Sequence, residues 1–232
     1  MAAAAVLGLA YLAARETPLF AVDRVDVRGA PPEVEEEVRL AAEPFVGESL
    51  VGLDGEELRR RLESLPAVRS FRYDRAFPST LAITVVPEEP AAVLRRRGDG
   101  WLVSERGRVI AAVERGQFRE LPRIRVHDEA PPTPGAAVAG ADAKQALAAV
   151  ARLPANFPVE VQAARTNPEG ITLRLAGGTE LRLGTFDSVG LKLAVAAQIL
   201  RTLPAGERQT LAYLDVSVPE RPVGSAEAQV SG

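Results

Sequence analysis

The sequence predicts an α+β protein of two small domains, the first with the order strand, helix, helix, strand, strand. Two observations carry this prediction. Apolar residues alternate with charged ones in short segments that end at glycine or proline, which is typical of half-buried strands. Between the first two of these segments, apolar residues recur at helical spacing. At 232 residues the chain can bury one large core or two small ones.

The composition excludes several classes of function. A net charge of −3 gives no electrostatic reason to expect nucleic-acid binding. The chain has no cysteine, which rules out disulfides, thiolate metal sites and a cysteine nucleophile. His127 is the only histidine, so neither a multi-histidine zinc site nor a Ser-His-Asp triad is expected. We therefore predict no metal and no cofactor.

The segment from Met1 to Ala14 is uncharged and mostly apolar, and Arg15 and Glu16 end it. A helix of that length reaches about 21 Å, less than the roughly 30 Å of a bilayer core. Three interpretations are open: the inner part of a truncated transmembrane helix, a short signal-like anchor, or an alanine-rich helix of a soluble protein. We favour the first and assign residues 1–16 to a membrane-anchor helix.

Residues 20–90 contain the first domain. Valines alternate with charged residues at 22–28, which predicts a strand that Gly29 ends. A helix begins at Pro31-Pro32, and Asp54 with Glu57 predicts a capping box at the start of a second helix. Two strands follow, with an alternating aromatic face on the first. The apolar residues expected on the buried faces are Val25, Val27, Val34, Val38, Ala41, Ala42, Phe45, Leu58, Leu62, Leu65, Phe71, Tyr73, Phe77, Leu81, Ile83 and Val85.

Residues 91–222 are predicted to form a second, mixed and mostly antiparallel β domain with helices. One helix is expected at 141–153, and another buries a stripe of leucine, valine and isoleucine. The members of that stripe are Leu191, Val195, Ile199 and Leu203. The expected strands are a three-stranded meander at 91–113, then 121–126, 159–164, 170–175, 180–183 and 210–218. Residues 223–232 are assigned to a disordered tail.

Several short motifs occur in a fixed order along these elements. In the first domain they comprise Phe20, Val22, Val25, Val27, Gly29, Leu65, Pro66, Val68, Pro78, Leu81, Ile83, Val85, Pro87 and Pro90. In the second they comprise LPRI at 121–124, Leu183, Gly184, Lys192, Tyr213 and Asp215. In this order and spacing the chain resembles the FtsQ/DivIB family of bacterial cell division proteins, with a POTRA domain followed by the family's β domain. It departs from the family pattern at Ser104, where an aspartate is usual, and at Ser217, where an arginine is usual.

The resemblance implies a non-enzymatic scaffold of the divisome that links early and late septal proteins. It implies a single-pass protein of the inner (cytoplasmic) membrane at the division septum, with its C-terminal bulk extracytoplasmic. The implied partners are FtsB- and FtsL-like membrane-anchored coiled-coil proteins, with other divisome proteins as partners of the POTRA domain. A partner segment is expected to add to an exposed strand edge through main-chain hydrogen bonds. The implied site is the last strand, with Leu211, Tyr213, Leu214, Asp215, Val216, Ser217, Val218 and Arg221.

Two other classes of function stay open. A POTRA-type module of an outer-membrane assembly or secretion apparatus would normally bring repeated POTRA units or a barrel, and neither pattern is present. An enzyme, for instance a wall-modifying one, needs a nucleophile with a base, a metal constellation or paired carboxylates in a pocket. Hydroxyl residues here have no histidine or lysine partner at motif spacing. A binding module is therefore favoured over an enzyme.

Overall fold

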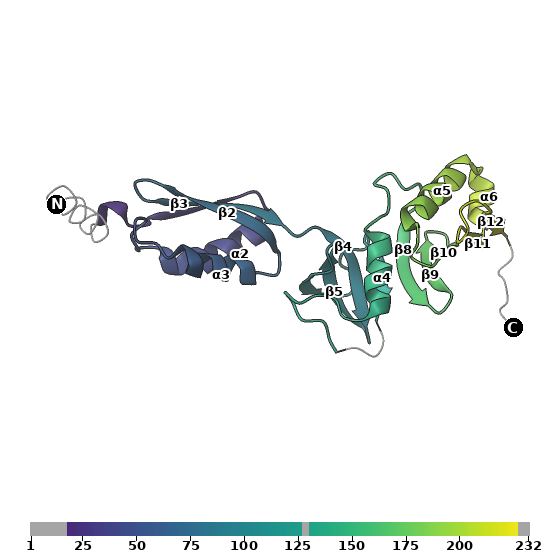
Figure 1. The fold of residues 1–232 in the computed structure, drawn as a ribbon, viewed down its shortest axis with the longest axis horizontal. Coiled ribbons are helices and arrows are strands. Elements are labelled where there is room, and N and C mark those ends of the chain that lie inside the picture. The colour runs from purple at the N-terminus through teal and green to yellow at the C-terminus, as the bar shows by residue number, and fades with distance from the viewer. Residues whose placement is uncertain (1–17, 127–129, 227–232) are drawn as a thin grey trace. The chain divides into compact units, whose positions relative to one another are not determined.

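The chain forms two compact units, Met1–Glu88 and Glu89–Gly232 (Figure 1). The computed structural model describes residues 18–126 and 130–226. The predicted anchor helix at 1–16, His127 and residues 227–232 of the predicted tail lie outside the described residues. Within the described ranges, no helix has both the length and the apolar character needed to cross a bilayer.

The first unit is a three-stranded sheet with two helices, as the sequence predicts (Figure 1). The strand order is β1-β3-β2, with β1 parallel and β2 antiparallel to the central strand β3. Buried residues alternate with more exposed ones along β3, so one face of the sheet is the buried face, on which the helices pack. The elements are η1 (Pro18–Phe20), β1 (Arg24–Arg28), α2 (Pro32–Ala42), η2 (Glu43–Phe45), α3 (Gly55–Ser64), β2 (Val68–Ala76) and β3 (Thr80–Pro87).

One hydrophobic core holds this unit together. Leu58 and Leu62 of α3 are fully buried in the core, as their helical spacing predicts. Phe77 is an exception, because β2 ends at Ala76 and leaves the Phe77 ring 58% exposed, where it meets Phe20 edge-on. The buried members are Val22, Val27, Val38, Ala42, Phe45, Leu50, Leu53, Leu58, Leu62, Val68, Leu81, Ile83 and Val85.

Helix α3 begins with half of the predicted capping box. Asp54 Oδ1 accepts hydrogen bonds from the amides of Glu56 and Glu57, at 3.0 and 3.1 Å. The Glu57 side chain does not reach back to Asp54 but accepts from Arg60 and Arg61 one turn further on. These hydrogen bonds, first from Arg60 and then from Arg61, hold the pKa of the exposed Glu57 carboxyl below its ordinary value. The same contact raises the pKa of Arg60.

The second unit is built on a nine-stranded sheet of order β12-β11-β10-β9-β8-β7-β4-β5-β6. The pairs β4–β7, β7–β8 and β10–β11 are parallel, and the other pairs are antiparallel. This agrees with the predicted mixed, mostly antiparallel β domain. The strands are β4 (Pro90–Arg96), β5 (Asp99–Ser104), β6 (Val109–Val113), β7 (Arg123–Arg125), β8 (Val161–Asn167), β9 (Gly170–Leu175), β10 (Glu180–Gly184), β11 (Tyr213–Asp215) and β12 (Val223–Ser225). The helices are α4 (Ala141–Val150), α5 (Val189–Thr202) and α6 (Ala205–Thr210).

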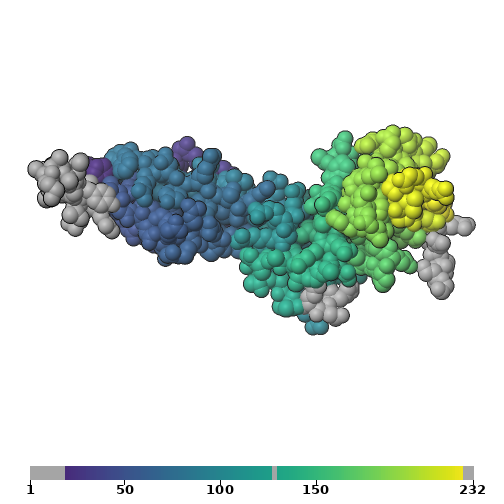
Figure 2. All heavy atoms as spheres, in the orientation of Figure 1, coloured from purple at the N-terminus to yellow at the C-terminus, as the bar shows by residue number. Residues whose placement is uncertain are grey.

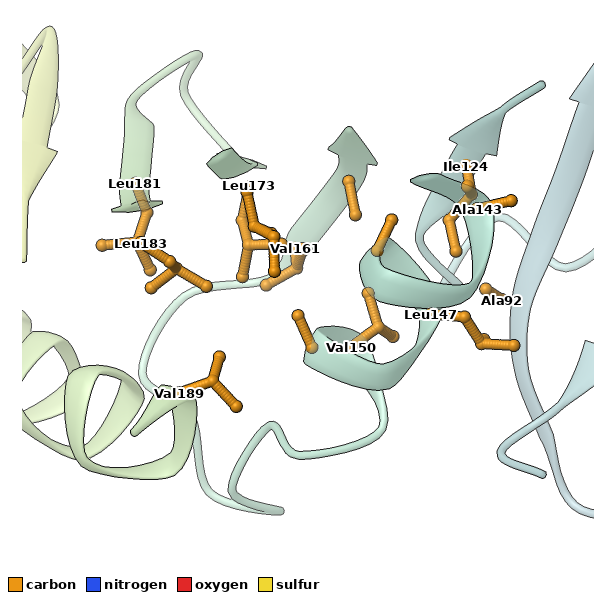
Figure 3. Packing of buried hydrophobic residues seen from close by; sticks show 14 of the residues in the cluster. Ala92, Ile124, Ala143, Leu147, Val150, Val161, Leu173, Leu181, Leu183 and Val189 are labelled. Carbon is orange, nitrogen blue, oxygen red and sulfur yellow. The ribbon is translucent and has the colours of Figure 1, made fainter. Parts of the chain in front are cut away.

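Helix α4 packs against β4, β7 and β8 in the middle of this sheet. Figure 3 shows its Leu147 side chain near Ala92 of β4 and its Ala143 near Ile124 of β7. Alanines on the buried face let the helix approach the strands closely, and the larger Leu147 fills the space between elements. The core continues past α4 to β9, β10 and α5.

Helix α5 agrees only in part with the predicted stripe. Val195 and Ile199 are partly buried and pack against the core, as predicted. Leu191, the first residue of the expected stripe, is 53% exposed. The buried face instead includes Lys192, which is only 3% exposed and whose Nζ donates to the Thr185 carbonyl at 2.8 Å. Alanines line this face beside larger residues such as Leu193 and Leu200, and the predicted stripe lies at its margin. The buried residues are Val189, Lys192, Leu193, Ala196, Ala197 and Leu200.

Candidate partner-binding site

The predicted last strand is neither as long as expected nor the edge of the sheet. The prediction placed one strand at 210–218, but Thr210 ends helix α6 and only Tyr213–Asp215 forms β11. Strand β11 pairs with β10 on one side and with β12 on the other. Its backbone therefore has no free side, and the assignment of 223–232 to a tail is wrong for Val223–Ser225, which forms β12.

The side chains predicted for the site divide into buried and accessible groups. Leu214 and Val216 are 2% and 0% exposed and belong to the hydrophobic core. Val218, at 52%, and Arg221 are exposed. The other four predicted residues, Leu211, Tyr213, Asp215 and Ser217, are half-buried. Buried side chains cannot contact a partner, so Leu214 and Val216 are unavailable, and Val218 and Arg221 are the most accessible of the predicted residues.

The polar side chains of β11 are engaged within the unit. The Arg182 guanidinium lies 4.4 Å from the centroid of the Tyr213 ring, a cation–π arrangement. Asp215 Oδ1 accepts from the Ser217 amide at 2.9 Å, which fixes the turn after the strand. Strand β10, which pairs with β11, carries Glu180. The Glu180 carboxylate accepts a hydrogen bond from Arg165 at 2.8 Å. These contacts position β11 and leave its polar side chains occupied.

Three small residues allow the strand ends beneath the site to approach closely. Gly170 has φ +114°, and a Cβ there would lie 2.2 Å from both C and O of Gly184. Gly184 itself has φ +63°, and its Cβ would lie 2.8 Å from Cβ of Ser217. Only glycine fits at 170 and 184 without displacing backbone or the neighbouring chain. Ser217, where the family pattern has arginine, lies at this contact.

The exposed edge of the sheet at this end is β12. It pairs antiparallel with β11, and within the described residues no strand pairs with its other side. Val223 is 54% exposed and Gly224 is also exposed. The C-terminal part of the unit, yellow in Figure 2, lies on the surface in that view. The outer side of β12 and the exposed Val218 and Val223 form what we call the C-terminal edge.

Sequence reasoning missed β12 because three residues between Pro222 and a polar tail are too short to show alternation. Val223 was the one available signal, since it is a β-branched residue in an otherwise polar segment. At the other end of the sheet, β6 is partly covered, because Val109 exchanges backbone hydrogen bonds with Gly135 and Ala136. Within residues 18–126 and 130–226, no group of histidine, aspartate and glutamate is arranged to hold a metal ion.

Comparison with known proteins gives matches to both units. A family model described as "Cell division protein FtsQ/DivIB, C-terminal" matches residues 92–217, and one described as "POTRA domain, FtsQ-type" matches residues 20–86. The cell division protein FtsQ of Streptomyces bingchenggensis is 26% identical over 203 residues, which cover 87% of this chain and 74% of the relative. The FtsQ of Myxococcus fulvus is 28% identical over 203 residues, covering 86% and 71%.

Among solved structures, the major extracytoplasmic domain of the trans isomer of the cell division protein DivIB from Geobacillus stearothermophilus aligns with a TM-score of 0.35 and 16% identity. The alignment covers 50% of this chain and 98% of that one.

Proposed function

Because this chain belongs to the FtsQ/DivIB family of cell division proteins, we propose that it is a non-enzymatic scaffold of the divisome. In this role it links early and late septal proteins at the cytoplasmic membrane through FtsB- and FtsL-like partners. The two family matches follow one another along the chain in the order POTRA, then C-terminal domain, which supports this role. The rival, a POTRA module of an outer-membrane assembly or secretion apparatus, is not favoured, because the second unit matches the FtsQ/DivIB C-terminal domain and not another POTRA domain.

The partner segment binds by adding a strand to the C-terminal edge. The observation that carries this proposal is that β12 is the last strand of the sheet among the described residues, with two exposed valines, Val218 and Val223, nearby. An extended segment gains affinity from main-chain hydrogen bonds along such an edge and specificity from side-chain contacts. Arg221, also exposed, offers a cation to an acidic group of the partner. Leu214 and Val216 contribute indirectly, because they anchor β11 in the core.

The size of this edge limits the affinity it can provide alone. A three-residue strand offers only a few hydrogen bonds, each with a net value of about 1 kcal/mol. Fully burying an exposed valine contributes roughly 1.5–3 kcal/mol. Val218 and Val223 are each only about half exposed, so a partner can bury only about half of each side chain. Membrane anchoring compensates, because two proteins tethered to one bilayer meet at a raised effective concentration. We assign the tether of this chain to the apolar segment at 1–16.

A pair of proline variants tests the edge. Val223→Pro places a proline in β12, and Ala112→Pro places one in β6, the strand at the opposite end of the same sheet. Proline removes a backbone donor and obstructs strand pairing. We expect the first variant to lose co-purification with the FtsB- and FtsL-like proteins of the same organism, and the second to retain it. Thermal melts of both variants check that the unit stays folded.

Undiminished capture by a folded Val223→Pro chain would refute strand addition at β12. The division role is tested separately by a fluorescent fusion in dividing cells. Septal localisation is expected, and a diffuse signal would contradict that role without bearing on the edge. A topology assay of residues 1–16 in the full chain tests the membrane tether, which we expect to leave the second unit outside the cytoplasm.

A further inference from the structure

A pocket of about 700 Å³ lies beside the turn between β4 and β5 in the second unit. Five of its lining residues are arginines, joined by Gly98 and Val126, and no carboxylate is among the described residues that line it. The sheet order places this turn several strands away from β12. We call this feature the arginine pocket; its arginines are Arg95, Arg96, Arg97, Arg115 and Arg125.

Strand pairing brings two of these arginines side by side. Arg95 of β4 and Arg125 of β7 are directly paired across parallel strands. The preceding pair, Leu94 and Ile124, is buried in the core, so the two arginines follow on the opposite face of the sheet. Like charges directly opposite each other destabilise a sheet. This register has an energetic disadvantage unless something else stabilises the pair.

Two glycines make room for the guanidinium groups. A Cβ on Gly100, which pairs with Arg95, would lie 2.7 Å from Arg95 Nη1. A Cβ on Gly98 would lie 2.5 Å from Arg115 Nη2, and Arg115 Nε donates to the Gly98 carbonyl at 3.3 Å. Arg97, at the same turn, holds the left-handed φ of +49° that non-glycine residues rarely adopt. The turn is therefore arranged so that the arginines converge.

The arginines have donors that the described protein does not satisfy. Arg95 Nη1 and Arg96 Nε are buried atoms without a hydrogen-bond partner. None of the five arginines forms an ion pair with another described residue. Buried donors are almost always paired in folded proteins, so unpaired ones call for an acceptor from outside. The acceptor must be anionic, because it has to offset several positive charges at once.

We propose that the arginine pocket binds a phosphate-bearing ligand, with a diphosphate or two neighbouring phosphodiester groups as the class that fits best. A guanidinium fork donates to phosphate oxygens in a bidentate manner, and a phosphate group concentrates charge and acceptors in a small volume. Among the described residues that line the pocket, Val126 is the only one with a wholly apolar side chain, so the recognition groups that the pocket offers are guanidinium groups. The proposal does not depend on strand addition at β12.

Inorganic pyrophosphate is the probe for the first test, by calorimetric titration of the full chain at low salt. Replacing Arg95 and Arg125 together with glutamine should weaken binding at least about tenfold, because two charge-assisted contacts are lost. The control replaces Arg59 and Arg60 of α3 with glutamine, which changes the net charge equally in the other unit. The control should bind like the unaltered chain.

Flotation with vesicles identifies the source of the phosphate. Binding to phosphatidylglycerol but not phosphatidylcholine vesicles, lost with Arg95 and Arg125 and competed by pyrophosphate, would support a lipid headgroup. Pyrophosphate binding without such vesicle binding would support a soluble or polymer-borne phosphate. Absence of both, or equal weakening in both double variants, would overturn the proposal. Tighter binding of a glutamate-rich peptide than of pyrophosphate would also overturn it, in favour of a carboxylate site.

Discussion

Replacing Gly170 with alanine should destabilise the second unit in two ways, through an unfavourable backbone conformation and through a steric collision between β9 and β10. Comparison with Gly177→Ala separates the two. Gly170 has φ +114°, and its Cβ would lie 2.2 Å from backbone atoms of Gly184. Gly177 has a similar φ of +89° but nothing within 4 Å of its Cβ. Gly177→Ala therefore measures the backbone cost alone, and Gly170→Ala adds the collision between strands.

The expected magnitudes follow from these distances. A left-handed conformation costs an L-residue about 1–2 kcal/mol, which is the whole effect expected for Gly177→Ala. The collision at Gly170 is with backbone, which cannot rotate away as a side chain can. Forcing extra volume into a packed site adds typically about 1–3 kcal/mol. We expect Gly170→Ala to lower the free energy of unfolding by about 2–5 kcal/mol in total.

Urea unfolding followed by tryptophan fluorescence provides the measurement. Trp101 is the only tryptophan of the chain and lies on β5, 8% exposed, so its emission reports on the second unit. At an m-value of about 2 kcal/mol per molar urea, the midpoint for Gly170→Ala should fall by roughly 1–2.5 M. A midpoint within about 0.3 M of the Gly177→Ala value would show that the strands tolerate a methyl group there, and would refute the close approach.

Two further predictions concern buried and exposed charges. Lys192→Ala should lower the free energy of unfolding of the second unit by about 1–3 kcal/mol, because it removes a buried aliphatic chain and the hydrogen bond to a backbone carbonyl. The control is Lys144→Ala, at the only other lysine, which is exposed. It should change the free energy of unfolding by less than about 0.5 kcal/mol. Since the folded pKa of Glu57 is lowered, its stabilisation is present at neutral pH and is lost as the pH falls through that value. The difference in melting temperature between the unaltered chain and Glu57→Gln should therefore shrink below about pH 4. A pH-independent difference would contradict the assigned arginine contacts.

The elements predicted best are those in which local pattern and burial agree. Leu81, Ile83 and Val85 alternate along the sequence and are all buried in β3. Leu58 and Leu62 lie one helical turn apart and are fully buried in α3. In both cases the periodicity of the backbone decides which side chains share a face, and the sequence displays that periodicity directly.

The strand that ends the sheet was predicted wrongly, for a physical reason. Which strand ends a sheet depends on how the strands pair, and a local pattern does not reveal that pairing. Strand β12 has only three residues, too few to show an alternation of apolar and polar side chains. The burial of Lys192 was not predicted, for another reason. A hydrophobicity pattern places a lysine outside, and only the position of the Thr185 carbonyl allows its charge to be satisfied inside. In both cases the deciding partner is not visible in the hydrophobic pattern of the segment itself.

The order of strands in the second unit also bears on how the chain is made. From β7 to β12, each strand lies beside the one synthesised just before it, so the sheet can extend outward as the chain emerges. The C-terminal edge exists only after residue 225 has been added. A nascent chain that stops earlier presents β10 or β11 as its last strand, with a different edge and different side chains. The proposed partner surface therefore forms only in chains that have been synthesised through β12.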